Sequence, residues 1–165
     1  MKENEKIRED VLRSVSNLTD DQLNQHTNQG EWSIMQVLYH LYLIEKAVVQ
    51  TIDETIAKGE KRTVEEKPIH LTINRSVKAK APAFAEPSKE FVPLKIIKEK
   101  LAESRKALHE AVEKVDSADL DQNSYPHPVF GALSLSQWVE FVGWHEKRHL
   151  EQINELKEAL FSQNE

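Results

Sequence analysis

The chain has 165 residues, a formal net charge of -6, 39% hydrophobic residues and no cysteine. This length predicts a single domain over residues 1–165, and the acidic balance argues against nucleic acid as a partner, because phosphate binding requires a concentrated basic surface. The lack of cysteine excludes disulfides, thiolate metal ligands and a cysteine nucleophile; with no long apolar run and no signal peptide, we expect a soluble cytoplasmic protein without a membrane span.

The first predicted elements are a long helix and a short one. Apolar residues recur at helical spacing over about residues 3–17, which predicts an amphipathic helix. Thr19 and Gln22 then form a capping-box pattern, in which each side chain bonds the other residue's backbone N–H. This pattern predicts a short helix that ends near Gln25.

The second long helix has the clearest start signal in the sequence. Ser33 and Gln36 repeat the capping-box spacing, and an apolar stripe continues from there until Gly59, a residue type that commonly ends helices. Residues 60–90 lack helical periodicity and predict a long irregular connection. Within it, residues 68–73 have the composition of an extended segment.

Two further helices are predicted in the second half of the chain. A third long helix is expected over residues 93–115, and residues 116–131 are expected to be irregular. Ser134 and Gln137 repeat the capping-box spacing once more and start a fourth long helix. Four amphipathic helices with a long crossover between the second and third predict an all-α four-helix bundle.

Three histidines are candidate metal ligands. His145 and His149 are four residues apart, so on a helix they share one face, and a helical wheel places both toward the bundle interior. Two neutral imidazoles one turn apart can bind one divalent metal ion. His40 lies at the border of the apolar stripe of the second long helix and is a third candidate. Three protein ligands would leave one coordination position open for chemistry.

Two carboxylates interrupt the same apolar stripes. Glu45 and Glu146 both lie on interior faces, where a charge needs a partner. One interpretation is that they orient a ligating imidazole or act as a general base. The other is that each is paired with an arginine or lysine.

The sequence resembles the DinB-like superfamily, and within it the YfiT-type branch, over roughly residues 5–160. The matching segments are Trp32-Ser33 with His40-Leu41, the stretch from His127 to Trp138, and the stretch from His145 to Ile153. The resemblance implies a four-helix bundle with a long crossover, and a divalent metal on His40, His145 and His149. It also implies a homodimer. Residues 61–88 contain no motif of the family.

The resemblance also bears on the cofactors. Nickel, zinc, manganese and iron all occur among family members, so the metal identity does not transfer. Characterised members include transferases and isomerases that use low-molecular-weight thiols such as mycothiol, glutathione or bacillithiol, and others are described as hydrolases.

Three functional hypotheses follow. The first is a metal-dependent S-transferase, in which metal coordination favours the thiolate of a small thiol and the thiolate attacks a small electrophile. Glu45 or Glu146 would then be the catalytic residue that orients an imidazole or takes the proton. The second is a metal-dependent hydrolase that uses metal-bound water. The third is a non-enzymatic dimeric metal-binding module, although a structural site usually has four ligands.

Overall fold

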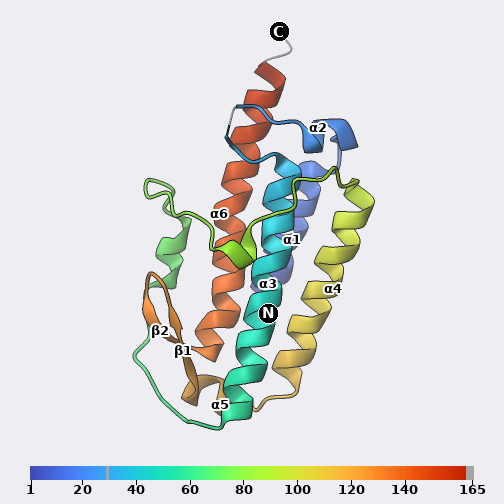
Figure 1. Cartoon of the computed structure of the whole chain (residues 1–165). Helices are drawn as coiled ribbons and strands as arrows, with labels where there is room; N and C mark the ends of the chain where they lie inside the picture. The colour runs from blue at the N-terminus through green and yellow to red at the C-terminus, as the bar shows by residue number, and fades with distance from the viewer. Residues whose placement is uncertain (29, 163–165) are drawn as a thin grey trace.

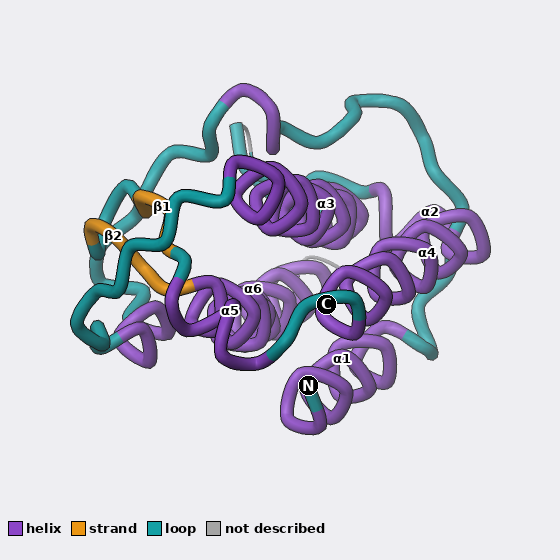
Figure 2. Tube along the Cα trace, turned by 90° about the horizontal axis from the view of Figure 1, so that it is seen from below, coloured by secondary structure: helices purple, strands orange, loops and turns teal. Residues whose placement is uncertain are grey.

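Four long helices form a bundle, as the sequence predicts. The computed structural model describes residues 1–28 and 30–162. The bundle helices are α1 (Lys2–Val15), α3 (Ile34–Lys58), α4 (Leu94–Glu113) and α6 (Leu135–Ser162), and seen end-on they surround a common centre (Figure 2). Within the described residues, no helix combines the length and apolar character needed to cross a membrane.

The long crossover sets the order of the helices. The two helices that flank it, α3 and α4, run in the same direction and pack side by side (Figure 1). The chain must therefore travel back along the bundle between them, and it does so over residues 59–93. This stretch contains two short 3-10 helices, η1 (Ile69–Ile73) and η2 (Ala83–Ala85).

The prediction of an extended segment at residues 68–73 was wrong. The backbone N–H of Leu71 donates to the carbonyl of Pro68, and that of Asn74 donates to the carbonyl of Leu71. These local turns satisfy backbone groups that have no neighbouring strand to pair with. The apolar side chain of Ile69 is buried, which anchors η1 to the bundle.

The first two predicted capping boxes are confirmed. Thr19 caps α2 (Asp20–Asn24) and Ser33 caps α3, and in each case the glutamine three residues later bonds back to the cap. Gly59 ends α3 in the left-handed conformation, with a φ of 65°. The long helix therefore starts and stops where its sequence signals lie.

The third predicted capping box is half correct. The hydroxyl of Ser134 accepts a hydrogen bond from the backbone N–H of Gln137 at 3.1 Å. The side chain of Gln137 bonds the backbone N–H and carbonyl of Lys67 instead, at 3.0 and 2.8 Å. This pair of bonds ties the crossover to the start of α6.

Residues 116–131 are more regular than the sequence predicted. They contain α5 (Ser117–Gln122) and β1 (Ser124–His127), and β1 pairs with the antiparallel β2 (Gly131–Ser134), so that His127 lies opposite Gly131. Four-residue strands are too short to show a clear alternation of apolar and polar residues, which explains the wrong prediction. The hairpin packs against α6.

The core divides into two apolar clusters. One surrounds Leu38 and Leu101 at one end of the bundle, and the other surrounds Ile52 and Leu108 at the other end. Polar residues separate the two clusters along each bundle helix. The histidines and the buried carboxylates both belong to this middle layer.

Candidate metal centre

His40, His145 and His149 meet between α3 and α6. The Nε2 atom of His145 lies 3.2 Å from Nε2 of His40 and 3.1 Å from Nε2 of His149. All three side chains are buried, and their potential ligand atoms lie within 4.8 Å of one another. The structure thus brings together the three histidines singled out in the sequence.

Hydrogen bonds fix the tautomer of two of these imidazoles. Nδ1 of His40 lies 2.8 Å from the carbonyl oxygen of Ala85, and Nδ1 of His149 lies 2.7 Å from Oε1 of Gln152. Both oxygens can only accept, so each Nδ1 carries the proton and each Nε2 presents a lone pair. Two lone pairs that converge on a third ring nitrogen form the donor set of a transition-metal site, and Ala85 and Gln152 supply the outer hydrogen bonds that such ligands commonly make.

Burial keeps the three imidazoles neutral. Burial lowers the pKa of His40, and together with the neighbouring His40 it lowers the pKa of His149 to about 3. The pKa of His145 lies well below its usual value because of burial and the proximity of His149 and His40. Neutral imidazole is the form that binds metal ions.

The donor set is incomplete for a closed site. In the part of the chain that the structure describes, no cysteine, aspartate, glutamate or further histidine joins the three ligands. The rings of Trp32 and Phe141 flank the group, with centroids 5.0 Å from that of His40 and 5.4 Å from that of His145. Three nitrogen donors in an aromatic setting fit a divalent metal that keeps a position open.

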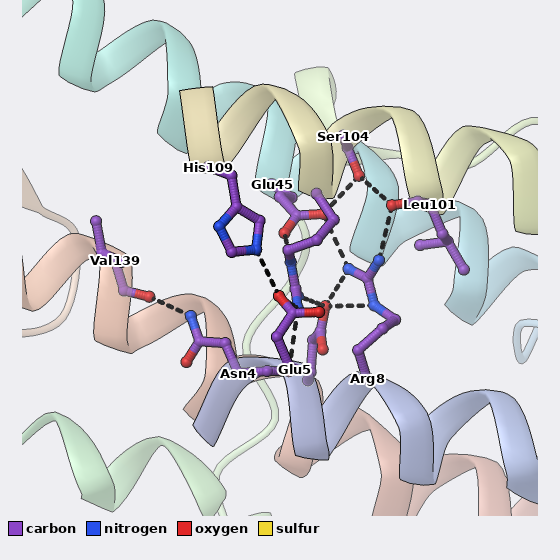
Figure 3. Close-up of polar contacts among 10 residues, drawn as sticks. Asn4, Glu5, Arg8, Glu45, Leu101, Ser104, His109 and Val139 are labelled. Carbon is purple, nitrogen blue, oxygen red and sulfur yellow. Dashed lines mark hydrogen bonds and ion pairs between the residues drawn. The ribbon is translucent and has the colours of Figure 1, made fainter. Parts of the chain in front are cut away.

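Glu45 and Glu146 belong to a different site on the inner side of the bundle. They form a cluster with Arg8 and Arg105, and Figure 3 shows Glu45 and Arg8 within it. Each bundle helix contributes one of these four charged residues: Arg8 from α1, Glu45 from α3, Arg105 from α4 and Glu146 from α6. The cluster therefore joins all four helices at mid-height.

The contacts within this cluster are short and buried. Glu45 Oε1 accepts from Nε of Arg105 at 2.6 Å, and Oε2 accepts from Nη2 of Arg8 at 2.9 Å and from the Ser104 hydroxyl at 2.5 Å. Glu146 Oε1 accepts from Arg8 and, at 3.0 Å, from Nη2 of Arg105. Burial raises the pKa of Glu146, against the opposing effect of the two arginines.

Neither carboxylate hydrogen-bonds to His40, His145 or His149 within the described residues. Their catalytic role stays a prediction, whereas the contacts that the structure shows are those of buried ion pairs. This matches the second interpretation of Glu45 and Glu146, pairing with arginine.

Some residues near the site were missed or misjudged at the level of sequence. The role of the Ala85 carbonyl cannot be predicted from the identity of the residue, because every residue has a backbone carbonyl. Gln152 could have been predicted, because it is three residues after His149 and shares its helix face. His127 is buried beside the hairpin turn, where its Nδ1 accepts from the backbone N–H groups of Val129 and Phe130. His109 lies outside the metal centre and contacts a carboxylate oxygen of Glu5 at 2.9 Å.

The chain is similar to known proteins over most of its length. The model of the DinB superfamily matches residues 3–153. The chain is 35% identical to "Uncharacterized protein YuaE" of Bacillus subtilis (strain 168), over 92% of this chain and 93% of that protein. It is 23% identical to a Bacillus mycoides (strain KBAB4) protein named "Putative metal-dependent hydrolase", over 97% of this chain and 84% of that protein.

A solved structure shows the same fold. The crystal structure of TT2238, described as a four-helix bundle protein, superposes with a TM-score of 0.66 over 93% of this chain and 94% of that chain. The two sequences are 20% identical, so this likeness concerns the fold alone.

Proposed function

Because this chain belongs to the DinB superfamily, we propose that it is a metal-dependent enzyme that joins a low-molecular-weight thiol to a small electrophile. One observation carries the proposal: the lone pairs of His40 and His149 converge on Nε2 of His145, and the described residues supply no fourth ligand. A bound divalent metal would supply a Lewis acid whose open position favours the thiolate over the thiol.

The residues of the chain itself prepare this site in two ways. Ala85 and Gln152 hold the Nδ1 protons of His40 and His149, which keeps both Nε2 atoms available as donors. Trp32 and Phe141 reduce the access of water to the imidazoles, and low local polarity strengthens the interactions of charged ligands there. The chain has no cysteine, so the sulfur must come from a small molecule.

Hydrolysis is the second candidate function. The name of the Bacillus mycoides relative favours it, and three nitrogen ligands with an open position suit a water nucleophile as well as a thiol. The two functions differ in one measurable respect, because hydrolysis proceeds without added thiol.

The first experiment tests the metal site. We expect protein purified without a histidine tag to contain near-stoichiometric metal by elemental analysis, and the His145→Ala/His149→Ala variant to contain little. His70→Ala is the matched control, because His70 is exposed in η1 and should leave the metal content unchanged. Equal metal content in all three proteins would contradict the site.

The second experiment separates the functions. The metal-loaded protein is incubated with an activated aryl halide or an activated ester, with and without bacillithiol, glutathione or cysteine. Conjugation that requires both thiol and metal supports the transferase, and ester cleavage without thiol supports the hydrolase. Stoichiometric metal without turnover of either kind would favour the non-enzymatic binding module, whose proposed dimeric state light scattering would test.

A further inference from the structure

His127 lies at the end of β1, in a wall of aromatic rings. Its ring centroid is 5.1 Å from that of Phe130, 5.0 Å from that of Trp138 and 4.7 Å from that of Phe141. Only 8% of the residue is exposed. The ring nitrogens of an imidazole in this setting pair with neighbouring groups, with water or with a ligand.

One nitrogen of His127 is fully engaged by the hairpin turn. Nδ1 accepts from the backbone N–H of Val129 at 3.1 Å and from that of Phe130 at 3.3 Å. An acceptor nitrogen carries no proton, so in the neutral ring the proton is on Nε2. Burial lowers the pKa of His127 to about 4, and the ring is therefore neutral at pH 7.

The other nitrogen is a donor without an acceptor. Among the described residues, no group accepts a hydrogen bond from Nε2 of His127. Nε2 is accessible to solvent although most of the ring is buried, so water can occupy this donor when no ligand is bound. A ligand with an oxygen acceptor can replace that water.

The position of His127 connects it with the candidate metal centre. The Phe141 ring contacts the His127 ring and, with a centroid distance of 5.4 Å, also the His145 ring. A small molecule held at the histidines has His127 as a neighbour.

We propose that Nε2–H of His127 is a specificity-determining hydrogen-bond donor, which selects ligands that carry an oxygen acceptor, such as a carboxylate or carbonyl, close to the metal-binding atom. This inference rests on the proposed function and deepens it, because it names the class of small molecule that the site prefers. His127 acts by binding the ligand, without any change of its own protonation.

Two substitutions separate the donor from the turn-capping role. In His127→Asn, the side-chain oxygen can still accept from Val129 and Phe130, but the Nε2–H donor is lost. In His127→Gln, the amide group reaches toward the Nε2 position and can donate, while the cap is lost. If His127 only caps the turn, His127→Gln should impair the protein and His127→Asn should not.

The test measures binding by the cobalt-loaded protein, followed through its absorption bands. Mercaptoacetate, which carries a thiol and a carboxylate, is compared with ethanethiol, which carries the thiol alone. We expect the parent to prefer mercaptoacetate and His127→Asn to lose about 3- to 10-fold of that preference, the range expected of one hydrogen bond. The affinity for ethanethiol should stay unchanged, and His127→Gln should keep part of the preference.

The possible failures are distinguishable. A parent protein that binds cobalt but neither thiol contradicts the proposed function. A parent that binds both thiols without preference, or a His127→Asn variant that keeps the full preference, contradicts the role of His127 alone. If His127→Asn does not fold or load cobalt, His127→Gln decides: loss of the preference in that variant, with ethanethiol binding intact, overturns the inference.

Discussion

His145 and Glu146 are consecutive residues of α6, yet their side chains enter two different buried polar sites. His145 Nε2 lies 3.2 Å from His40 Nε2, whereas Glu146 Oε1 lies 3.0 Å from Nη2 of Arg105. Neighbouring positions of a helix point about 100° apart, so one turn of α6 faces both the candidate metal centre and the interior of the bundle. The ion pairs of Glu146 therefore also fix the backbone that carries His145, a candidate metal ligand.

Removal of one charge from this cluster should destabilise the fold. In Glu146→Gln, Arg8 and Arg105 lose a buried carboxylate partner, and we expect the free energy of unfolding to fall by about 3–5 kcal/mol. Urea denaturation followed by circular dichroism measures the change. Glu151→Gln, an exposed position on the same helix, is the control and should change stability by less than about 0.5 kcal/mol.

The same variant tests the predicted catalytic role of Glu146. If Glu146→Gln keeps its stability and metal but loses turnover, the carboxylate acts on the reaction and the structural interpretation is contradicted.

Gly143 should tolerate no side chain, because α1 approaches α6 there. A Cβ at position 143 would lie 2.4 Å from Oδ1 of Asn4, whose amide donates to the carbonyl of Val139 at 2.8 Å. We expect Gly143→Ala to lower the free energy of unfolding by about 1–3 kcal/mol despite the better helix propensity of alanine. If the steric conflict is the cause, the Asn4→Ala/Gly143→Ala variant will be more stable than the sum of the two single effects predicts.

Acid should weaken the fold partly through His127. Its pKa is about 4 in the folded protein, against an ordinary value of 6.5, so between these values only the unfolded chain takes up the proton. The stability linked to His127 is complete above about pH 6.5 and is lost as the pH falls toward 4, with a slope of at most about 1.4 kcal/mol per pH unit. The free energy of unfolding of the metal-free parent should thus decrease more steeply below pH 6.5 than that of His127→Asn. Parallel pH profiles would refute this linkage.

Arg148 should hold the crossover against α6. Its guanidinium donates to the carbonyls of Thr72 at 3.0 Å, Val77 at 2.7 Å and Asn74. Arg148 donates from two nitrogens, Nη1 and Nη2, and the single ammonium nitrogen of lysine cannot occupy both positions. We therefore expect Arg148→Lys to be cleaved faster by a protease within residues 72–80, with the metal content unchanged. Equal cleavage rates in the parent and the variant would show that other contacts hold this segment.

The sequence predicted the features that depend on local periodicity and capping. The capping boxes at Thr19 and Ser33, the stop at Gly59 and the inward faces of His145 and His149 all follow from residues within a few positions of one another. The proximity of His40 to the other two histidines was supported by the resemblance to a family, because helix periodicity alone does not bring two helices together.

The features that sequence could not predict depend on distant partners. Gln137 has the spacing of a capping residue, but Lys67, 70 positions away, offers its side chain two hydrogen bonds instead of one. The positions of Glu45 and Glu146 on interior helix faces indicated only that each carboxylate needs a partner. That Arg8 and Arg105 are those partners follows from the packing of all four helices.

The bond between His40 and the main-chain oxygen of Ala85 has an evolutionary consequence. Every amino acid has a backbone carbonyl oxygen. A substitution at position 85 therefore keeps the hydrogen bond to Nδ1 of His40, as long as the backbone path is kept. The neighbouring Phe84, 64% exposed, can then be exchanged without disturbing the imidazole. The surface of the crossover can therefore change without loss of the three nitrogen donors.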